Sequence, residues 1–591
     1  MCGICGELRF DGQSPDLKQI QSMMKELEKR GPDHGGTYSD GPLGMGHRRL
    51  SIIDLTEHAN QPMVDQELGL SLVFNGTIYN YPELREELTA KGYHFFSTGD
   101  TEVILKAFHA WGEQCVERLS GMFAFAVWDM AKQRLFLARD RFGIKPLYYA
   151  YEHGRFLFAS NTQALLAAGG VDTRLDPTGL HHQFTLHAVV PAPTTIFMGV
   201  RKLSPGHSLT VELTGKPKLH QYWELRARRP ANKLSDADWI EAIHEALKRA
   251  VDKRIRIADV PVGVLLSGGL DSSLLVGLLS EAGVSGLKTF TVGFEDQPEE
   301  KGSEFEYSDP VAERFATEHH KFHVPNSHVL ERLPEAVDAM AEPMFGQDAV
   351  AFYLLSEQVS KQVKAVQSGQ GADEVFGGYF WYPQMAAEAE GSLVERFRKH
   401  YFDRDHDEWL DMISSGFHTG DVTSDLIDQK LNAIQGDEFI DRVLALDATT
   451  LIVDDPVKRV DNMTMAWGLE ARVPFLDHEL VELAASMPPE LKMREGGKYV
   501  LKKIARGLVP DSVIDRPKGY FPVPALKYVR GEFLDFMRDI LNSQACRERG
   551  IYQRDYIEKL LSAPESHLTR IKGSKLWHLA LFEFWLQRHG L

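Results

Sequence analysis

A short apolar run that ends in a glycine-rich turn constrains the fold of this chain more than any other segment. Residues 262–266 read Val-Gly-Val-Leu-Leu, which is typical of a buried strand, and residues 267–273 continue as Ser-Gly-Gly-Leu-Asp-Ser-Ser into a helical pattern. Glycines allow backbone N–H groups to approach an anion, and the start of a helix attracts negative charge. The segment therefore predicts an α/β domain with a phosphate site. A plain strand-to-helix turn is the alternative, but three hydroxyls and a carboxylate at one turn favour a ligand site.

Further strands with helical segments between them are expected at residues 288–294, 321–324 and 364–367, as in a parallel sheet. Ligands of such sheets bind beyond the carboxyl ends of the strands, where residues 368–379 supply Ser-Gly-Gln-Gly-Ala-Asp-Glu-Val-Phe-Gly-Gly-Tyr. We expect Asp271 and Asp373 to hold Mg²⁺ on a pyrophosphate, with helix capping as the alternative for each. The turn lacks the lysine of the GxxxxGK(S/T) loop, so transfer of a γ-phosphate is not indicated.

A polar, arginine-containing stretch divides the 591 residues into two parts. We predict a first domain over 2–223, a linker over 224–238, and a second domain over 239–591, with Ser235 or Asp236 capping the next helix. The first domain is expected to be rich in sheet. Its expected elements are a helix over 17–27, strands over 122–128 and 134–139, and a hairpin over 147–158. Beyond about residue 391 the pattern is mostly helical.

Charge and cysteine content exclude several classes of protein. The formal net charge of −18 argues against a general nucleic-acid binder, and four cysteines are too few for a disulfide scaffold of this length. Residues 177–200 carry no Asp, Glu, Lys or Arg, but they contain three histidines and three prolines and so do not predict a membrane span. The N-terminus also lacks the pattern of a secretion signal. We expect a cytoplasmic protein with no membrane or nucleic-acid partner.

Cys2 is a candidate nucleophile. Removal of the initiator Met would give one residue both a thiol and a free α-amine. Their reference pKa values are about 8.5 and about 7.7–8.0, so the amine can accept the thiol proton. An inert cysteine, or a redox or metal pair of Cys2 with Cys5, is the alternative. Because the sequence contains no second cysteine pair, we favour the nucleophile.

Several blocks together resemble the class II glutaminase domain: Cys-Gly-Ile at 2–4, Arg-Gly-Pro-Asp at 30–33, Gly-His-Arg-Arg-Leu-Ser-Ile at 46–52, Phe-Asn-Gly-Thr-Ile-Tyr-Asn at 74–80 and Arg-Asp-Arg-Phe-Gly-Ile-Lys-Pro-Leu-Tyr at 139–148. Joined to the 267–273 turn, they resemble glutamine-dependent asparagine synthetases over essentially the whole chain. The resemblance implies an N-terminal-nucleophile αββα glutaminase domain. It also implies a parallel-sheet synthetase domain of the adenine-nucleotide α-hydrolase type, with a mostly helical C-terminal part, and a homodimer.

The resemblance also implies roles in the first domain. Cys2 would attack the side-chain amide of glutamine, while Asn75 and the Gly76 N–H stabilise the oxyanion. Arg49 would hold the α-carboxylate of glutamine and Asp100 its α-ammonium. Taken singly, Arg49 and Asp100 are better explained by surface salt bridges, and Asn75-Gly76 by a hairpin turn; together with Cys2 they favour the glutamine site.

In the second domain, the resemblance implies that an acceptor carboxylate attacks ATP to give an acyl adenylate and pyrophosphate, after which channelled ammonia displaces AMP. The residues expected to contact ATP are Leu265, Ser267, Gly268, Gly269, Asp271, Ser272, Val292, Ser368, Gly369 and Lys518. Lys518 would neutralise phosphate charge, with a solvated lysine as the alternative. Asp461, Glu470 and Arg472 either line a pocket or form buried salt bridges between helices.

The sequence departs from the family at three positions. Gln370 stands where aspartate-using synthetases usually carry an acid, and Thr77 and Asn161 stand where glutamate is common. With the acidic stretch at 295–306 and a C-terminal extension, the chain looks most like bacterial N-acetylglutaminylglutamine amidotransferases, which amidate a capped dipeptide used as an osmoprotectant. Aspartate is the alternative acceptor. A glutaminase with a regulatory α/β half would require the 267–273 turn to be inactive. A non-enzymatic sensor of glutamine and ATP would require Cys2→Ala to leave function unchanged.

Overall fold

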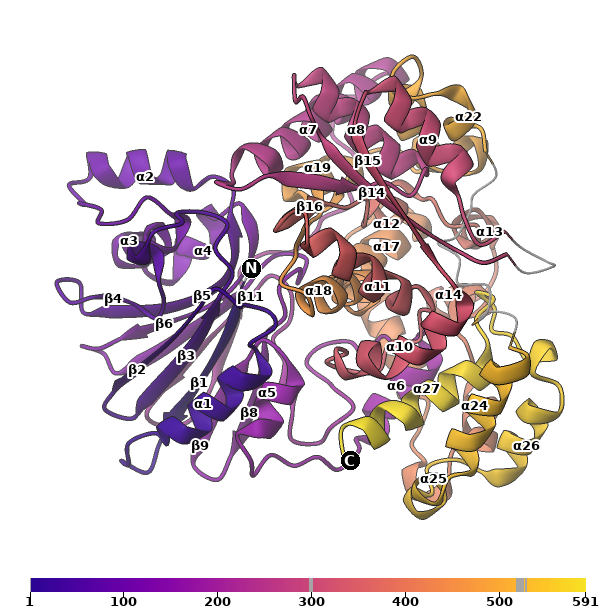
Figure 1. Cartoon of the computed structure of the whole chain (residues 1–591), viewed down its shortest axis with the longest axis horizontal. Helices are drawn as coiled ribbons and strands as arrows, with labels where there is room; N and C mark the ends of the chain where they lie inside the picture. The colour runs from indigo at the N-terminus through magenta and orange to yellow at the C-terminus, as the bar shows by residue number, and fades with distance from the viewer. Residues whose placement is uncertain (1, 297–300, 517–525, 527–528) are drawn as a thin grey trace.

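The computed structural model describes residues 2–296, 301–516, 526 and 529–591. Its N-terminal part contains two antiparallel sheets, drawn in indigo and violet in Figure 1, and the rest contains one parallel sheet surrounded by helices. The C-terminal helices, in yellow, pack beside this second part (Figure 1).

The two antiparallel sheets have six strands each. The first has the order β10-β8-β9-β1-β3-β2, with β1 (Gly3–Arg9), β2 (His34–Asp40), β3 (Leu43–Arg49), β8 (Tyr148–Glu152), β9 (Arg155–Ala159) and β10 (Arg201–Lys202). The second has the order β12-β11-β7-β6-β5-β4, with β4 (Met63–Asp65), β5 (Leu70–Ile78), β6 (Gly121–Asp129), β7 (Arg134–Arg139), β11 (His207–Glu212) and β12 (Lys218–Gln221). The predicted strands over 122–128 and 134–139 and the hairpin over 147–158 are confirmed.

These sheets form the two middle layers of four. Apolar side chains from both sheets, including Ile4, Val73 and Trp128, pack together between them. The outer face of the second sheet is covered by α2 (Tyr81–Ala90), α3 (Asp100–Trp111) and α4 (Cys115–Arg118). The first sheet is covered by α1 (Leu17–Glu26) and α5 (Thr162–Ala167), whereas α6 (Pro177–Thr185) packs against α15 (His406–Met412) and α16 (Val422–Ala433). The predicted αββα layering is therefore confirmed.

The second part is built on a five-stranded parallel sheet of order β15-β14-β13-β16-β17. Its strands are β13 (Val262–Leu265), β14 (Lys288–Phe294), β15 (Glu318–Val324), β16 (Ala365–Gln367) and β17 (Glu470–Arg472). The first four were predicted. The sequence pattern did not predict β17, because a three-residue Glu-Ala-Arg segment has no apolar run; its pairing with β16 makes it a strand.

Helices cover both faces of this sheet, as parallel sheets require. One face packs on α7 (Asp236–Arg256), α8 (Leu270–Glu281), α19 (His478–Ala485) and α21 (Tyr499–Ala505). The other packs on α10 (Asn326–Asp338), α11 (Asp348–Ser360) and α18 (Lys458–Met465). Further helices before residue 391 are α9 (Phe305–Arg314), α12 (Ala372–Phe376) and α13 (Trp381–Ala387).

Beyond residue 391 the described chain is mostly helical, as predicted. The remaining helices are α14 (Leu393–Tyr401), α15 (His406–Met412), α16 (Val422–Ala433), α17 (Phe439–Leu446), α20 (Glu490–Met493), α22 (Asp511–Ile514), α24 (Gly531–Asn542), α25 (Gln544–Arg549), α26 (Arg554–Ser562) and α27 (Lys575–Arg588).

The stretch over 224–238 leads into α7. The Ser235 side chain accepts a hydrogen bond from the N–H of Asp238, so Ser235 rather than Asp236 is the cap. Ala227 is buried, and its N–H donates to the carbonyl of Gln435 at 2.9 Å. This end of the stretch therefore packs against the helical part.

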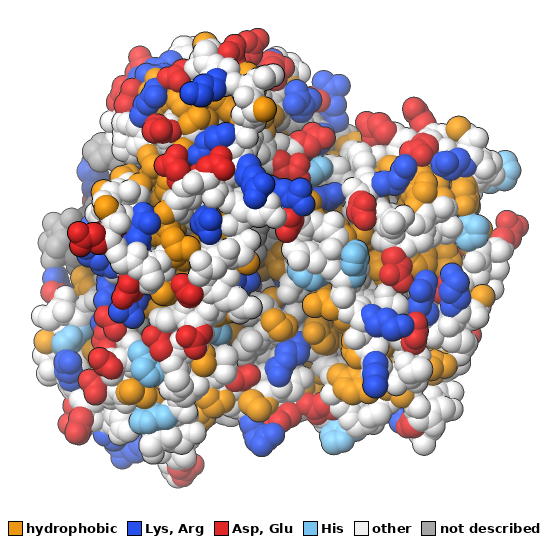
Figure 2. Space-filling model, turned by 180° about the vertical axis from the view of Figure 1, so that it is seen from behind, with side chains coloured by type: hydrophobic (Ala, Val, Ile, Leu, Met, Phe, Trp, Pro, Cys, Tyr) orange, Lys and Arg blue, Asp and Glu red, His pale blue; other side chains and the backbone are white. Residues whose placement is uncertain are grey.

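Acidic and basic side chains are interspersed over the face of the molecule that Figure 2 presents. Among the residues that the structure describes, none of the helices combines the length and apolar character of a membrane span.

Candidate active sites

Cys2 lies directly before β1 and lines a cavity of about 30 Å³. The cavity is also lined by Arg49, Leu50, Ile52, Ile53, Ala59, Gln61, Phe74, Gly76, Thr77, Asp100, Thr101 and Glu470. The Cys2 backbone N–H donates to Asn75 Oδ1 at 3.0 Å. Burial raises the pKa of the Cys2 thiol above its ordinary value. The thiol is therefore kept protonated until a base removes the proton.

Asn75 and Gly76 lie within β5, so the alternative of a hairpin turn is wrong. They pair with Ala124 and Phe123 of β6. Gly76 adopts a φ of +155°, and a Cβ there would lie 2.1 Å from the carbonyl of Met122, so the position requires glycine. Because Asn75 Oδ1 accepts from Cys2, its amide Nδ2 points elsewhere, buried and without a hydrogen-bond partner among the described residues. An unpaired buried donor beside a thiol is suited to stabilise an oxyanion.

Arg49 is buried at the end of β3 rather than on the surface. Its Nη1 donates to the carbonyl of Thr56 at 2.8 Å and to Asn60 Oδ1 at 2.7 Å, and its Nη2 to the carbonyl of Asp54. These bonds tie the guanidinium to the loop after β3. A guanidinium has five N–H donors, so they leave Nε–H and one Nη2–H for a carboxylate.

Asp100 is the first residue of α3 and also lines the Cys2 cavity. Its Oδ2 accepts from the N–H of Ile78 at 3.0 Å. Burial raises the pKa of Asp100 to about 6, although this hydrogen bond opposes the shift. The carboxylate is thus a buried acceptor that forms no salt bridge with any described residue, and a bound ammonium group would compensate its charge.

Cys5 does not form a pair with Cys2. Its thiol donates to the carbonyl of Gly46 at 3.7 Å, and its side chain packs with Ile20 and Leu27 of the helical layer. Cys2 lines the cavity instead. Both cysteines are free, and their different surroundings do not favour a Cys2–Cys5 redox or metal pair.

Two residues far along the sequence reach the Cys2 region. Glu470 of β17 lines the cavity and accepts from the Thr77 hydroxyl at 3.3 Å. Burial would raise the pKa of Glu470, but positive groups including Arg472 and Lys145 outweigh it and lower the pKa to about 2. Glu470 of the parallel sheet therefore contributes an ionised carboxylate to the lining of the Cys2 cavity. The sequence analysis had left this placement open.

Asp461 of α18 forms buried salt bridges, the second of the two roles that the sequence left open. It pairs with Arg30 at 2.9 Å and with Lys145 at 3.4 Å, all three being buried. Arg30 also donates from Nε to the Cys2 carbonyl at 3.3 Å. These salt bridges connect α18 with the loops of the N-terminal part, and so they do not run between helices as one alternative had proposed.

A second cavity of about 580 Å³ lies at the carboxyl ends of the parallel strands. The residues expected to contact ATP that line it are Leu265, Ser267, Gly269, Asp271, Ser272, Ser368 and Gly369. Gly268 and Val292 do not line the cavity. Gly268 instead supplies a left-handed turn with φ +75°, where a Cβ would lie 2.7 Å from the N of Ser308. Val292 is buried next to Thr291, which does line the cavity. Lys518 lies outside the described residues.

Asp271, Asp373 and Lys498 form the charged centre of this cavity. Lys498 Nζ lies 2.6 Å from Asp271 Oδ2 and 2.9 Å from Asp373 Oδ1. Burial opposes charge on Lys498, but the two carboxylates outweigh it and raise its pKa above the ordinary value. The helix caps are Gly269 and Gly371, so capping does not explain either aspartate. Two carboxylates facing one cation match what Mg²⁺ needs from a protein. The sequence analysis did not predict a role for Lys498. The Gly-Gly pair directly before it, at 496–497, is the feature that could have indicated one.

The wall beside Asp373 carries Gln370 and Tyr379. Glu374 lies behind it, accepting from the Tyr379 hydroxyl at 2.7 Å. Burial, helped by the charge of Asp373, raises the pKa of Glu374 to about 7. Gln370, the third residue of the loop that begins at Ser368, thus presents a neutral amide to the cavity. Asn161, the third departure from the family pattern, caps α5 by accepting from Ala164 N–H at 3.0 Å.

The two cavities are linked by β16 and β17. Glu470 pairs with Ala365 at one end, and the N–H of Ser368 donates to the carbonyl of Arg472 at the other, at 2.9 Å. Glu470 lines the Cys2 cavity and Ser368 the larger one. Three residues of extended strand span roughly 10 Å, so the two linings are separated by about that distance along the sheet.

Comparison with known proteins agrees with this two-part arrangement. A family profile described as "Glutamine amidotransferase domain" matches residues 1–223, and one described as "Asparagine synthase" matches residues 242–587. Asparagine synthetase 1 (glutamine-hydrolyzing) of Bacillus subtilis is 33% identical, with the match covering 99% of this chain and 96% of that protein.

Two further relatives differ in what they are named for. A putative asparagine synthetase (glutamine-hydrolyzing) of Mycobacterium tuberculosis is 35% identical over 86% of this chain and 85% of its own length. A protein of Gibberella zeae named amidase chry2 is 28% identical over 89% of each chain.

Proposed function

Since the chain belongs to the glutamine-dependent asparagine synthetase family, and is thus an ATP-dependent amide ligase that hydrolyses glutamine, we propose that Cys2 begins one half of its reaction and the Asp271–Lys498–Asp373 centre serves the other. We propose further that the acceptor is N-acetylglutaminylglutamine and the product its amide, an osmoprotectant. The observation that supports this acceptor is that Gln370, a neutral amide, lines the wall of the larger cavity.

The glutaminase half uses the residues around the small cavity. The α-amine of Cys2 takes the thiol proton, and Sγ attacks the glutamine side-chain amide. Asn75 Nδ2, a buried donor without a partner among the described residues, and the Gly76 N–H receive the oxyanion. Arg49 holds the α-carboxylate with its remaining donors and Asp100 the α-ammonium. Ammonia leaves, and water then hydrolyses the thioester to glutamate.

The small cavity is narrow. Its volume is about 30 Å³. Ile52, Ile53 and Ala59 form part of its lining and belong to the loop that Arg49 holds. We propose that this loop opens to admit glutamine and that Arg49, on binding the substrate carboxylate, closes it again.

The synthetase half binds ATP over the 267–273 turn and the loop at 368–373. Asp271 and Asp373 would hold Mg²⁺, which neutralises pyrophosphate charge when bound. Lys498, which lies between the two carboxylates, would offer its positive charge to the phosphates. The acceptor carboxylate attacks the α-phosphorus to form the acyl adenylate, and ammonia arriving along β16 and β17 attacks its carbonyl carbon and releases AMP.

A neutral amide at position 370 suits an acceptor without a charged amine. Aspartate carries an α-ammonium that a carboxylate would compensate, whereas the capped dipeptide has an acetylated nitrogen and offers only amides and one carboxylate. A partly buried amide such as Gln370 can hydrogen-bond to amides at no cost in charge. Glutamine in place of an acidic residue at position 370 therefore removes a preference for aspartate. It does not remove the capacity to adenylate a carboxylate.

The test is pyrophosphate release by the full chain with ATP, Mg²⁺ and glutamine, comparing the capped dipeptide, aspartate and no acceptor. We expect release to rise only with the capped dipeptide and Gln370→Glu to weaken that preference. The Cys2→Ala chain should lose glutamine-driven turnover with every acceptor. Stimulation by aspartate alone would contradict the proposed acceptor but not the reaction class.

Aspartate is kept as the second candidate because the Bacillus subtilis and Mycobacterium tuberculosis relatives are named asparagine synthetases. The resemblance also implies a homodimer, which the molar mass of the purified chain in solution, set against 66.6 kDa for one copy, will test.

A further inference from the structure

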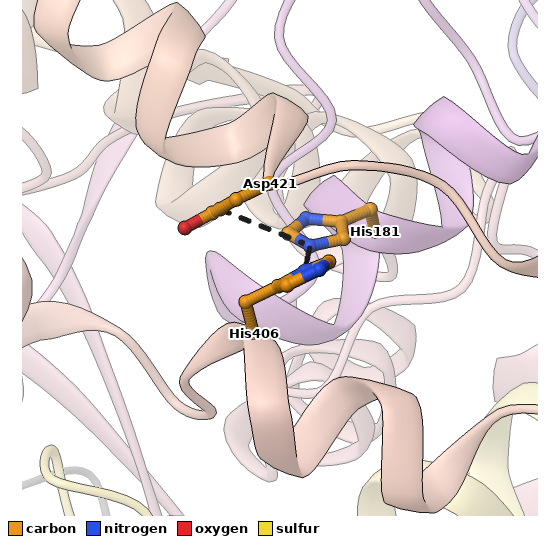
Figure 3. A group of neighbouring side chains, drawn as sticks. All are labelled: His181, His406 and Asp421. Carbon is orange, nitrogen blue, oxygen red and sulfur yellow. Dashed lines mark hydrogen bonds and ion pairs between the residues drawn. The ribbon is translucent and has the colours of Figure 1, made fainter.

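Three side chains from distant segments meet at α6 (Figure 3). None of them lines either cavity. His181 belongs to α6, His406 begins α15, and Asp421 is the residue before α16. His181 Nε2 lies 3.0 Å from His406 Nδ1 and 3.9 Å from Asp421 Oδ1. All three potential ligand atoms lie within 4.8 Å of one another. His181 comes from the uncharged, histidine-containing stretch over 177–200, to which neither half-reaction assigns a role.

We propose that His181, His406 and Asp421 bind one Zn²⁺ ion. Zinc takes imidazole nitrogens and carboxylate oxygens at about 2.0–2.2 Å in tetrahedral geometry, which places neighbouring ligand atoms about 3.3 Å apart. The observed separations of 3.0 and 3.9 Å lie on either side of this value. Small side-chain rotations therefore suffice to close the site. Two imidazoles and one carboxylate leave the fourth position for water.

Thr423 favours the tautomer of His181 that can bind a metal through Nε2. Its hydroxyl oxygen lies 2.5 Å from His181 Nδ1 and 2.9 Å from His182 Nδ1. A hydroxyl has one hydrogen to donate, so it can donate to His182 and accept from His181 Nδ1–H. That arrangement leaves the lone pair of His181 Nε2 directed at His406 and Asp421. Metal-bound histidines characteristically donate their other N–H in this way.

A second group, His187, Asp403 and His578, has similar spacing but suits a metal less well. His187 Nδ1 and His578 Nδ1 lie 3.1 and 3.5 Å from Asp403 Oδ2. His578 is fully buried, and its Nε2 has no hydrogen-bond partner among the described residues. Binding a metal through Nδ1 would place a hydrogen on that nitrogen with no acceptor, at the cost of an unpaired buried donor. Asp421, by contrast, is 29% exposed, so an ion and its water can reach the first group.

The ion would join the two parts of the molecule. α6 belongs to the segment matched by the glutamine amidotransferase profile, whereas α15 and α16 belong to the segment matched by the asparagine synthase profile. One ligand from the first part and two from the second make the site a cross-link between them. Binding to the folded state alone raises the stability of that state.

The test uses the full chain with Cys2→Ala, so that the candidate nucleophile does not compete for zinc. The protein is stripped with a chelator and titrated with Zn²⁺ alone against a chromogenic chelator, and bound metal is counted after desalting. We expect one zinc per chain and an unfolding temperature that rises with zinc. We expect Thr423→Val to weaken binding about 10- to 100-fold and His406→Asn at least as much.

His187→Asn is the matched control, because it removes one imidazole from the second group and should leave zinc binding unchanged. His406 is only partly buried, so His406→Asn should fold, and its metal-free unfolding temperature will check this. Equal zinc affinity in the His406→Asn chain overturns the proposal, as does loss of binding in the His187→Asn chain alone. The outcome is independent of the acceptor.

Discussion

The two cavities hold their chemistry in different ways. The Cys2 cavity measures about 30 Å³, and Asn75 and Gly76 lie inside a strand that is paired along its whole length. The larger cavity measures about 580 Å³, and its residues lie on loops after strands and on helix starts. The first site is fixed by backbone pairing, whereas the second is held in shape by ion pairs of Lys498 with two carboxylates.

This difference indicates what each site can tolerate. A covalent step needs a thiol, a donor and a substrate carbonyl held to a fraction of an ångström, which paired strands provide. A nucleotide brings its own charges, so a site for it needs compensating groups that can rearrange. We therefore expect changes in the first site to act on one half-reaction, and changes in the charged centre to act on the other.

The largest effect is expected from Cys2→Ala. Removing the nucleophile should reduce glutamine hydrolysis by at least about 10³-fold, since no other group can form the thioester. Pyrophosphate release driven by ammonium salts should stay within about twofold, because the larger cavity contains no part of Cys2. Both rates can be measured on one preparation. An equal loss of the ammonia-driven rate would contradict the prediction that the two sites act separately.

Lys498→Met is the reciprocal change. It removes the cation between Asp271 and Asp373 and should lower pyrophosphate release about 100-fold, the usual cost of losing one electrostatic contact to a transition state. Glutamine hydrolysis assayed without ATP should change little. Lys498→Arg, which keeps the charge, should recover part of the rate. A loss confined to glutaminase activity would contradict the assignment.

A smaller effect, about tenfold, is expected from pH. Asp100 has a pKa raised to about 6 by burial, so below pH 6 its carboxyl group is neutral in the free enzyme and cannot pair with the ammonium of glutamine. kcat/KM for glutamine should fall about tenfold for each pH unit below 6. kcat should change less, because a bound ammonium favours the ionised carboxylate. A flat kcat/KM profile between pH 5 and 7 would remove Asp100 from substrate binding.

Local patterns explain what the sequence predicted well. The turn at 267–273, the strands beside it and the Asn75-Gly76 pair are each specified by neighbouring residues, whose periodicity and glycine content are visible in the chain itself. Even there, Asn75-Gly76 has the composition of a hairpin turn but lies within β5, because Gly76 is needed for its close approach to Met122.

Long-range partners account for what was missed. Lys498 pairs with Asp271 across 227 positions, and Thr77 meets Glu470 across 393. Nothing next to either residue in the sequence specifies the other. Glu470 was expected to line a pocket or to form a salt bridge, and its strand of three residues has no apolar pattern that would predict it. These contacts arise only when the parallel sheet packs against the N-terminal part.

The smallest effect is expected where the two sites meet. Thr77→Val removes the 3.3 Å hydrogen bond to Glu470 while keeping the volume of the side chain. One such bond is worth about 0.5–1.5 kcal/mol, or roughly two- to tenfold in rate. Because Glu470 belongs to the strand whose other end pairs with Ser368, we expect the loss in glutamine-driven amide formation and not in glutamine hydrolysis alone. Thr77→Ser, which keeps the hydroxyl, is the control. Equal loss in both reactions would place Thr77 in the Cys2 site alone and leave β17 without a part in linking the two cavities.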